Sequence, residues 1–134
     1  MLRDVEKLKL WLALVEDWDP ADGTSSEGFL SARAALGTLA MTCFDDGVAN
    51  AMIAADFCKT YKFVLTTNNK DLVHRVLVSL LDLLDEGREN IGIHFLEGQF
   101  LDALADCTAV VDDLRDLAES VMKALAHAVK KVEI

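Results

Sequence analysis

The strongest pattern of apolar positions lies in residues 71–87 and predicts a helix. A polar turn at residues 67–70 precedes this segment, and Gly87 closes it, where a left-handed C′ glycine commonly ends a helix. Its leucines and valines recur at steps of one, three and four residues, which places them on one helical face. This apolar stripe consists of Leu72, Val73, Val76, Leu77, Leu80, Leu81 and Leu84.

Similar patterns recur on either side of this segment, in residues 31–40 and 117–126. Leu36, Leu80 and Met122 occupy equivalent places in the three patterns, 44 and 42 residues apart. A helical repeat of about 40–47 residues is typical of armadillo and HEAT arrays. We therefore predict an all-α protein, an armadillo/HEAT-like right-handed α-solenoid of about two and a half to three repeats.

The remaining apolar patterns predict two long helices followed twice by a short, short, long series. Ser25 or Ser26 is expected to cap the second helix, and Asp45 or Asp46 the third. The second helix is expected to bury Phe29, Leu30, Ala32, Leu36, Leu39 and Ala40. Small residues at 32, 34, 35 and 37 predict a close neighbouring helix. The expected helices span residues 3–16, 27–43, 47–55, 57–66, 71–87, 89–97, 100–106 and 110–130.

This order divides one armadillo-repeat domain, residues 1–134, into a partial repeat and two whole ones. The partial repeat covers residues 1–44, and the whole repeats cover 45–87 and 88–131. The chain thus starts inside a repeat, which predicts a C-terminal fragment of a longer solenoid. A stack that starts there exposes the apolar face of its first unit. We therefore expect self-association through this N-terminal face.

Composition narrows the possible partners and the cellular location. A net charge of −10 argues against binding to nucleic acid or to an anionic membrane, because both require concentrated Lys and Arg. No apolar run reaches the roughly 18 residues that span a bilayer. Cys43, Cys58 and Cys107 are odd in number and far apart, which is typical of reduced thiols. We expect a cytoplasmic protein.

The sequence holds no arrangement that indicates catalysis. G-x-S-x-G, H-E-x-x-H and glycine-rich phosphate loops are absent from it, and His94 with Glu97 forms a lone H-x-x-E. Paired acids such as those at 112–113 suit helix N-termini better than acid–base chemistry. We expect a protein that is not an enzyme and has neither cofactor nor metal.

Four passages resemble the UCS domain (Unc/Cro/She) of the myosin chaperones. They are residues 5–15, 34–42, 69–89 and 95–104, and the His74-Arg75 pair in its polar and apolar setting is the most specific part. Residues 18–28 look like an insertion, and Asp82 stands where the family often has Asn. The resemblance implies a chaperone or co-chaperone that binds the myosin motor domain along a solenoid groove. Some family members recruit Hsp90 through a TPR module, which is not present in this chain, so Hsp90 is expected only as an indirect partner.

In an armadillo unit the third helix lines the groove, and this register predicts a protein-binding site. Three alternatives stay open: Arg75 pairs with Asp71 or with an acid of the last helix, the chain is a generic armadillo scaffold, or it is a helical bundle with a small-molecule pocket. Trp18 either anchors a partner or packs under its own loop. The expected groove residues are Ala34, Thr38, Val78, Asp82, Ser120 and Ala124, flanked by Arg33, Arg75 and Ser79.

Overall fold

The structure is a computed structural model, and it describes residues 2–43, 45–85, 95, 100–110 and 112–132. Within these ranges all regular secondary structure is helical, which confirms the all-α prediction. Gly87, the His94–Glu97 spacing and all of the expected helix at 89–97 except Phe95 lie outside the described residues. The helices are α1 (Leu2–Glu16), η1 (Pro20–Asp22), α2 (Glu27–Thr42), α3 (Asp46–Ala54), α4 (Phe57–Thr66), α5 (Lys70–Asp85), α6 (Phe100–Val110), η3 (Asp112–Leu114) and α7 (Arg115–Val132).

Side-chain caps fix where several helices begin. Ser26 Oγ accepts a hydrogen bond from the backbone N–H of Phe29 at 3.1 Å and starts α2. Asp45 caps α3 in the same way, through the N–H of Val48 at 3.1 Å. Each cap satisfies an N–H group that has no partner inside its helix. Both caps confirm the residues that the sequence indicated.

The predicted boundaries between the last two helices are wrong: α6 was expected to end at residue 106 but runs to Val110. The sequence indicated a single last helix over residues 110–130, whereas Val110 ends α6 and the short helix η3 separates it from α7. Acidic residues at 112 and 113 favour the start of a helix over its interior, because the positive end of the helix dipole lies there. The apolar pattern alone runs across this break.

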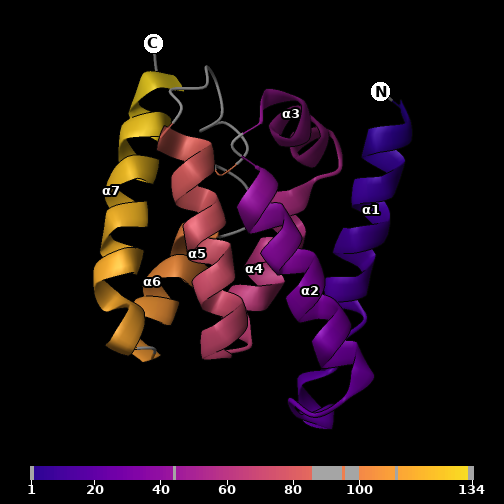
Figure 1. The fold of residues 1–134 in the computed structure, drawn as a ribbon. Helices are drawn as coiled ribbons and strands as arrows, with labels where there is room; N and C mark the ends of the chain where they lie inside the picture. Colours follow the sequence, from indigo (N-terminus) through magenta and orange to yellow (C-terminus); the bar gives the residue numbers. More distant parts are fainter. Residues whose placement is uncertain (1, 44, 86–94, 96–99, 111, 133–134) are drawn as a thin grey trace.

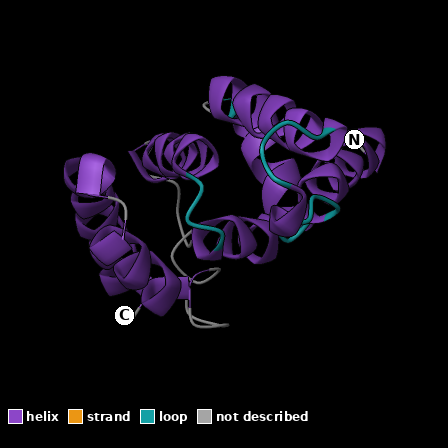
Figure 2. Cartoon of the chain, turned by 90° about the horizontal axis from the view of Figure 1, so that it is seen from below, coloured by secondary structure: helices purple, strands orange, loops and turns teal. Residues whose placement is uncertain are grey.

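The α-helices form two rows that share one core. In the first row α2 contacts α5, and α5 contacts α7; the three helices lie side by side and run in the same direction (Figure 1). In the second row α1 contacts α4, and α4 contacts α6. The short helix α3 packs against α1 and α4. Figure 2 shows the same helices from below, with the described loops in teal.

The predicted apolar stripe of α5 forms the centre of this core. Six of its seven residues are buried and Leu81 is partly buried, while Leu83 is a buried residue that the stripe did not include.

A chain of edge-to-face aromatic contacts connects α4 to α6. Ring centroids lie 5.9 Å apart for Phe57 and Phe95, and 5.0 Å apart for Phe95 and Phe100.

The positions of Trp18 and Leu30 decide two expectations from the sequence, one about the loop before α2 and one about α2 itself. Trp18 is buried: its Nε1 donates to the carbonyl oxygen of Gly23 at 3.1 Å, and its ring meets Phe29 edge-on at 5.4 Å. It therefore packs under its own loop. Leu30 was expected in the core but is 55% exposed, because it lies on the side of α2 that faces solvent.

Candidate protein-binding face

The residues expected to line a groove fall on the three parallel helices of the first row. These side chains differ in their exposure to solvent. Because α2 contacts α5 and α5 contacts α7, these residues lie on neighbouring helices, and we call the exposed and half-buried ones among them the α2–α5–α7 face. Ala34, Thr38 and Ser120 are exposed on it, and Val78, Asp82 and Ala124 are half-buried.

The most apolar part of this face is a stripe along α2. Leu30 is 55% exposed and Met41 is 77% exposed, and Ala34 and Thr38 lie between them. Steps of four, four and three residues place these side chains on one helical face over about 16 Å. We call these four residues the α2 stripe. The sequence reasoning missed its two ends, although the same helical steps lead to them from Ala34 and Thr38.

Ser79 does not belong to the face, so its expected place beside the groove is wrong. Its side chain is fully buried, and its hydroxyl lies 2.7 Å from the hydroxyl of Tyr61 on α4. Its Oγ also lies 3.6 Å from the sulfur of Cys43. Burial raises the pKa of Tyr61 well above its usual range, although the Ser79 hydrogen bond acts in the opposite direction. Ser79 is a polar contact inside the core.

Two arginines converge on one carboxylate where α2 meets α5. Arg33 Nε donates to Asp71 Oδ2 at 2.6 Å, and Arg75 Nε donates to Asp71 Oδ1 at 3.1 Å. Partial burial raises the pKa of Asp71, but the hydrogen bonds and charges of both arginines outweigh this effect and lower it. The alternative in which Arg75 pairs with Asp71 is therefore confirmed.

Gly37 makes room for this arrangement. A Cβ atom built at position 37 would overlap Nη1 of Arg75, so the guanidinium of Arg75 lies directly on the surface of α2. Ala32 and Ala35 are buried on the same helix. The run of small residues thus indicated a close contact correctly. What reaches into the space is a charged side chain, which the sequence did not reveal.

Arg33, Asp71 and Arg75 form an ion cluster, which a further ion pair extends toward α7. Lys70, at the start of α5, donates a hydrogen bond to Asp113 in η3, and this contact lowers the pKa of the Asp113 carboxyl. Two open hollows flank the cluster. The hollow of about 400 Å³ is lined by Lys70, Asp71, His74 and Leu114. The hollow of about 460 Å³ is lined by Thr24, Phe29, Leu30, Arg33, Asn69, Lys70 and Asp71.

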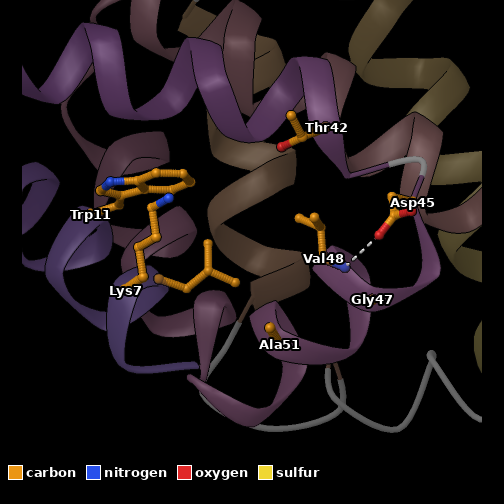
Figure 3. Close-up of a pocket in the computed structure, with 8 residues that line it drawn as sticks. Lys7, Trp11, Thr42, Asp45, Gly47, Val48 and Ala51 are labelled. Atoms are coloured by element: carbon orange, nitrogen blue, oxygen red, sulfur yellow. Dashed lines mark hydrogen bonds between the residues drawn. The ribbon is translucent and has the colours of Figure 1, made fainter. Parts of the chain in front are cut away.

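A separate pocket of about 210 Å³ lies between α1, the end of α2 and the start of α3 (Figure 3). Leu8, Trp11, Val48 and Ala51 give it mainly apolar walls. The ammonium group of Lys7 lies 5.2 Å from the centre of the Trp11 ring. The Asp45 carboxylate on its rim caps α3. The pocket suits an apolar side chain or a small apolar molecule.

The described residues show little that favours covalent or metal chemistry. Burial, helped by the charge of Asp56, raises the pKa of Cys58 to about 12, and burial also raises the pKa of Cys107. Both thiols are therefore protonated and weakly nucleophilic at neutral pH. Within the described ranges no three His, Cys, Asp or Glu residues gather in a way that could hold a metal ion. No helix in those ranges is both long and apolar enough to cross a membrane.

Comparisons with protein-family models, curated proteins and solved structures found no match to this chain. Its function is therefore inferred from the geometry of the described residues and from the resemblance of the four sequence passages. Of the features above, the α2 stripe and the ion cluster both include residues of α2, and the ion cluster joins α2 to α5. The α2–α5–α7 face is the candidate site.

Proposed function

We propose that the chain is a protein-binding module of the armadillo type and that it binds its partner on the α2–α5–α7 face. The parallel row of α2, α5 and α7 supports this, because armadillo arrays stack the long third helices of successive repeats in one row. In this proposal the helices of the second row correspond to the second helices of the repeats, and the short helix α3 corresponds to a first helix. On this interpretation the chain holds about two and a half to three repeats.

The α2 stripe is the single observation that carries the proposal. Single exposed leucines are ordinary, but an exposed apolar row along one helix is typical of a surface that a partner covers. Leu30 and Met41 are among the most exposed large hydrophobic side chains of the described residues. The small side chains of Ala34 and Thr38 between them leave room for a partner's backbone to approach α2.

The resemblance to the UCS domain identifies the myosin motor domain as the partner to test, in a cytoplasmic chaperone or co-chaperone of the actomyosin system. An indirect link to Hsp90 would require a TPR module on another segment or protein. One observation favours a generic armadillo scaffold as the second candidate. Arg75, half of the pair that carries the resemblance, is held by Asp71 within the chain. Such a residue can be present for packing alone.

The experiment is a binding titration of a purified myosin motor domain against the full chain and three variants. Leu30→Glu and Met41→Glu place a charge on the α2 stripe. Leu101→Glu is the matched control, because Leu101 is 43% exposed on α6, in the other row. We expect each stripe variant to weaken binding about tenfold or more, as for a central interface residue, and the control to bind like the parent chain.

Two results would reject parts of this proposal. If the parent chain neither binds the motor domain nor protects it from heat aggregation, the myosin assignment is wrong. If the parent chain binds and the stripe variants bind equally well, the α2–α5–α7 face is not the binding surface. Circular dichroism on each variant ensures that a loss of binding is not a loss of folding.

A further inference from the structure

The guanidinium groups of Arg33 and Arg75 have hydrogen-bonding capacity beyond their shared contact. Within the described part of the chain each arginine contacts Asp71 through Nε alone. A guanidinium carries five N–H donors, four of them on its two Nη atoms. The side chain of Arg33 is 47% exposed and that of Arg75 is 27% exposed. Nη1 of Arg75 lies against Gly37, so Arg75 can offer the donors of Nη2 to an acceptor from outside, and Arg33 can offer the donors of both Nη atoms.

The ion-paired groups at this site carry a net positive charge, in contrast to the chain as a whole. Arg33, Lys70 and Arg75 bring three positive charges, and the carboxylates of Asp71 and Asp113 bring two negative ones. The whole chain carries a net charge of −10. An acidic group would thus meet a locally favourable site on a protein that otherwise repels it. This contrast favours binding of an acidic group at this site over the rest of the surface.

The hollow beside the cluster adds an apolar wall. Phe29 and Leu30 line it together with Arg33, Lys70 and Asp71. Leu30 is also the first residue of the α2 stripe. A ligand that extends along the stripe would therefore place one end next to Arg33 and would pass Arg75, which lies farther along α2 against Gly37. The site suits an acidic side chain with an apolar neighbour.

We propose that the Arg33–Asp71–Arg75 cluster binds an acidic peptide segment of the partner protein. A Glu or Asp carboxylate accepts hydrogen bonds from the Nη groups of Arg33 and Arg75, and an adjacent apolar side chain enters the hollow beside Leu30. Charge-assisted hydrogen bonds of this type are short and strong. The proposal rests on the proposed function, since it specifies the chemistry of the partner at the same face.

The probe is a blocked peptide, Gly-Glu-Glu-Leu-Phe-Gly, titrated into the ¹⁵N-labelled full chain and followed by NMR. The readout is the Nε–Hε signals of Arg33 and Arg75. We expect these two signals to shift in a saturable way with a dissociation constant of about 1 mM or tighter. The matched peptide Gly-Gln-Gln-Leu-Phe-Gly should bind at least about tenfold more weakly, because it lacks the charge. A phosphate titration that moves the same signals more tightly than the acidic peptide would overturn the assignment to a carboxylate.

Gly37→Ala tests the geometry of the site without changing any charge. The new Cβ would displace the guanidinium of Arg75, so affinity for the acidic peptide should fall about fivefold, the effect of losing one hydrogen bond. Alanine favours helix more than glycine does, so the fold should hold. Gly28→Ala is the matched control on the same helix, because its Cβ would meet only ordinary contacts at 3.7 Å. Its affinity should not change.

Charge removal tests the donors themselves. Arg33→Gln and Arg75→Gln should each weaken binding of the acidic peptide about tenfold. Arg115→Gln, at an exposed position at the start of α7, removes the same charge elsewhere and should change the affinity less than twofold.

Besides the phosphate result, three results would overturn the inference: equal binding of the Gln peptide, no shift at Arg33 and Arg75, or an unchanged affinity in Gly37→Ala. These failures are separate from a failure of the proposed function. If Met41→Glu abolishes motor-domain binding but the acidic peptide does not bind, only the arginine site is wrong. If the acidic peptide binds and the stripe variants have no effect on the motor domain, only the proposed function is wrong.

Discussion

The hydrogen bond between Tyr61 and Ser79 gives the sharpest test of how the core is built. The two hydroxyl oxygens lie 2.7 Å apart, and both side chains are fully buried. Ser79→Ala removes the only hydrogen-bond partner that the structure shows for the Tyr61 hydroxyl within the described residues. A buried hydroxyl without a partner costs about 1–3 kcal/mol. We expect Ser79→Ala to lower the free energy of unfolding by about 2 kcal/mol.

Tyr61→Phe perturbs the same contact from the other side, with a smaller effect. Ser79 Oγ still lies 3.6 Å from the Cys43 sulfur, so its hydroxyl keeps a weak partner. We expect a loss of about 1 kcal/mol. The double variant leaves neither hydroxyl behind. Its loss should therefore be about 1 kcal/mol smaller than the sum of the two single losses.

Urea unfolding of the four proteins, followed by circular dichroism and tryptophan fluorescence, measures these free energies. Ser120→Ala is the matched control, because Ser120 is exposed on α7, and it should change stability by less than about 0.5 kcal/mol. If Ser79→Ala behaves like this control, Ser79 is a surface residue and the packing of α4 against α5 is wrong. Additive losses in the double variant would show that the two hydroxyls do not interact.

Three further outcomes are expected. The lowered pKa of Asp71 means that its ionised form stabilises the fold above its unfolded-state pKa of about 3.8, and this contribution disappears as the pH falls through the lower folded-state value. Asp71→Asn should therefore lower the free energy of unfolding at pH 7. Below pH 4 the variant and the parent chain should become more alike in this free energy, as acid unfolding measures it. A difference that stays the same at both pH values would contradict the pairing. The Cys58 thiol, with a pKa raised from 9.0 to about 12, should form roughly 1000-fold less thiolate at pH 8 than a free thiol. Its labelling by a disulfide reagent, followed by mass spectrometry, should be slower in proportion, and rapid labelling in the folded chain would contradict its burial. Leu10 is 68% exposed and Leu14 43% exposed on α1, which supports self-association through this helix; sedimentation should show a concentration-dependent species that Leu10→Glu removes, and a strictly monomeric parent chain would reject the idea.

The sequence predicted those parts of the fold that depend on local periodicity. The helix α4 begins and ends where its pattern indicated, and six of the seven residues of the α5 stripe are buried. Periodicity succeeds there because one side of each helix is clearly more apolar than the other. The caps at Ser26 and Asp45 could also be predicted from the sequence, because each depends on residues only three positions apart.

The sequence was less informative about α2, which carries small and apolar residues on several sides. Leu30 was assigned to the core, because nothing local shows which side of α2 meets α1 and α5. The pairing of Arg33 with Asp71 joins residues 38 positions apart, and only the packing of α2 on α5 brings them together. The burial of Ser79 likewise depends on the facing Tyr61. The candidate site therefore required the structure, although most of its residues were expected at the surface.

The central claim is that a partner protein contacts the α2–α5–α7 face, and site-specific photocrosslinking tests it most directly. A benzophenone amino acid replaces Thr38, in the middle of the α2 stripe, or Leu101, on α6 in the other row. After irradiation with the myosin motor domain, we predict a crosslinked product from position 38 and none from position 101. Crosslinking from position 101 alone, or equally from both positions, would contradict the claim.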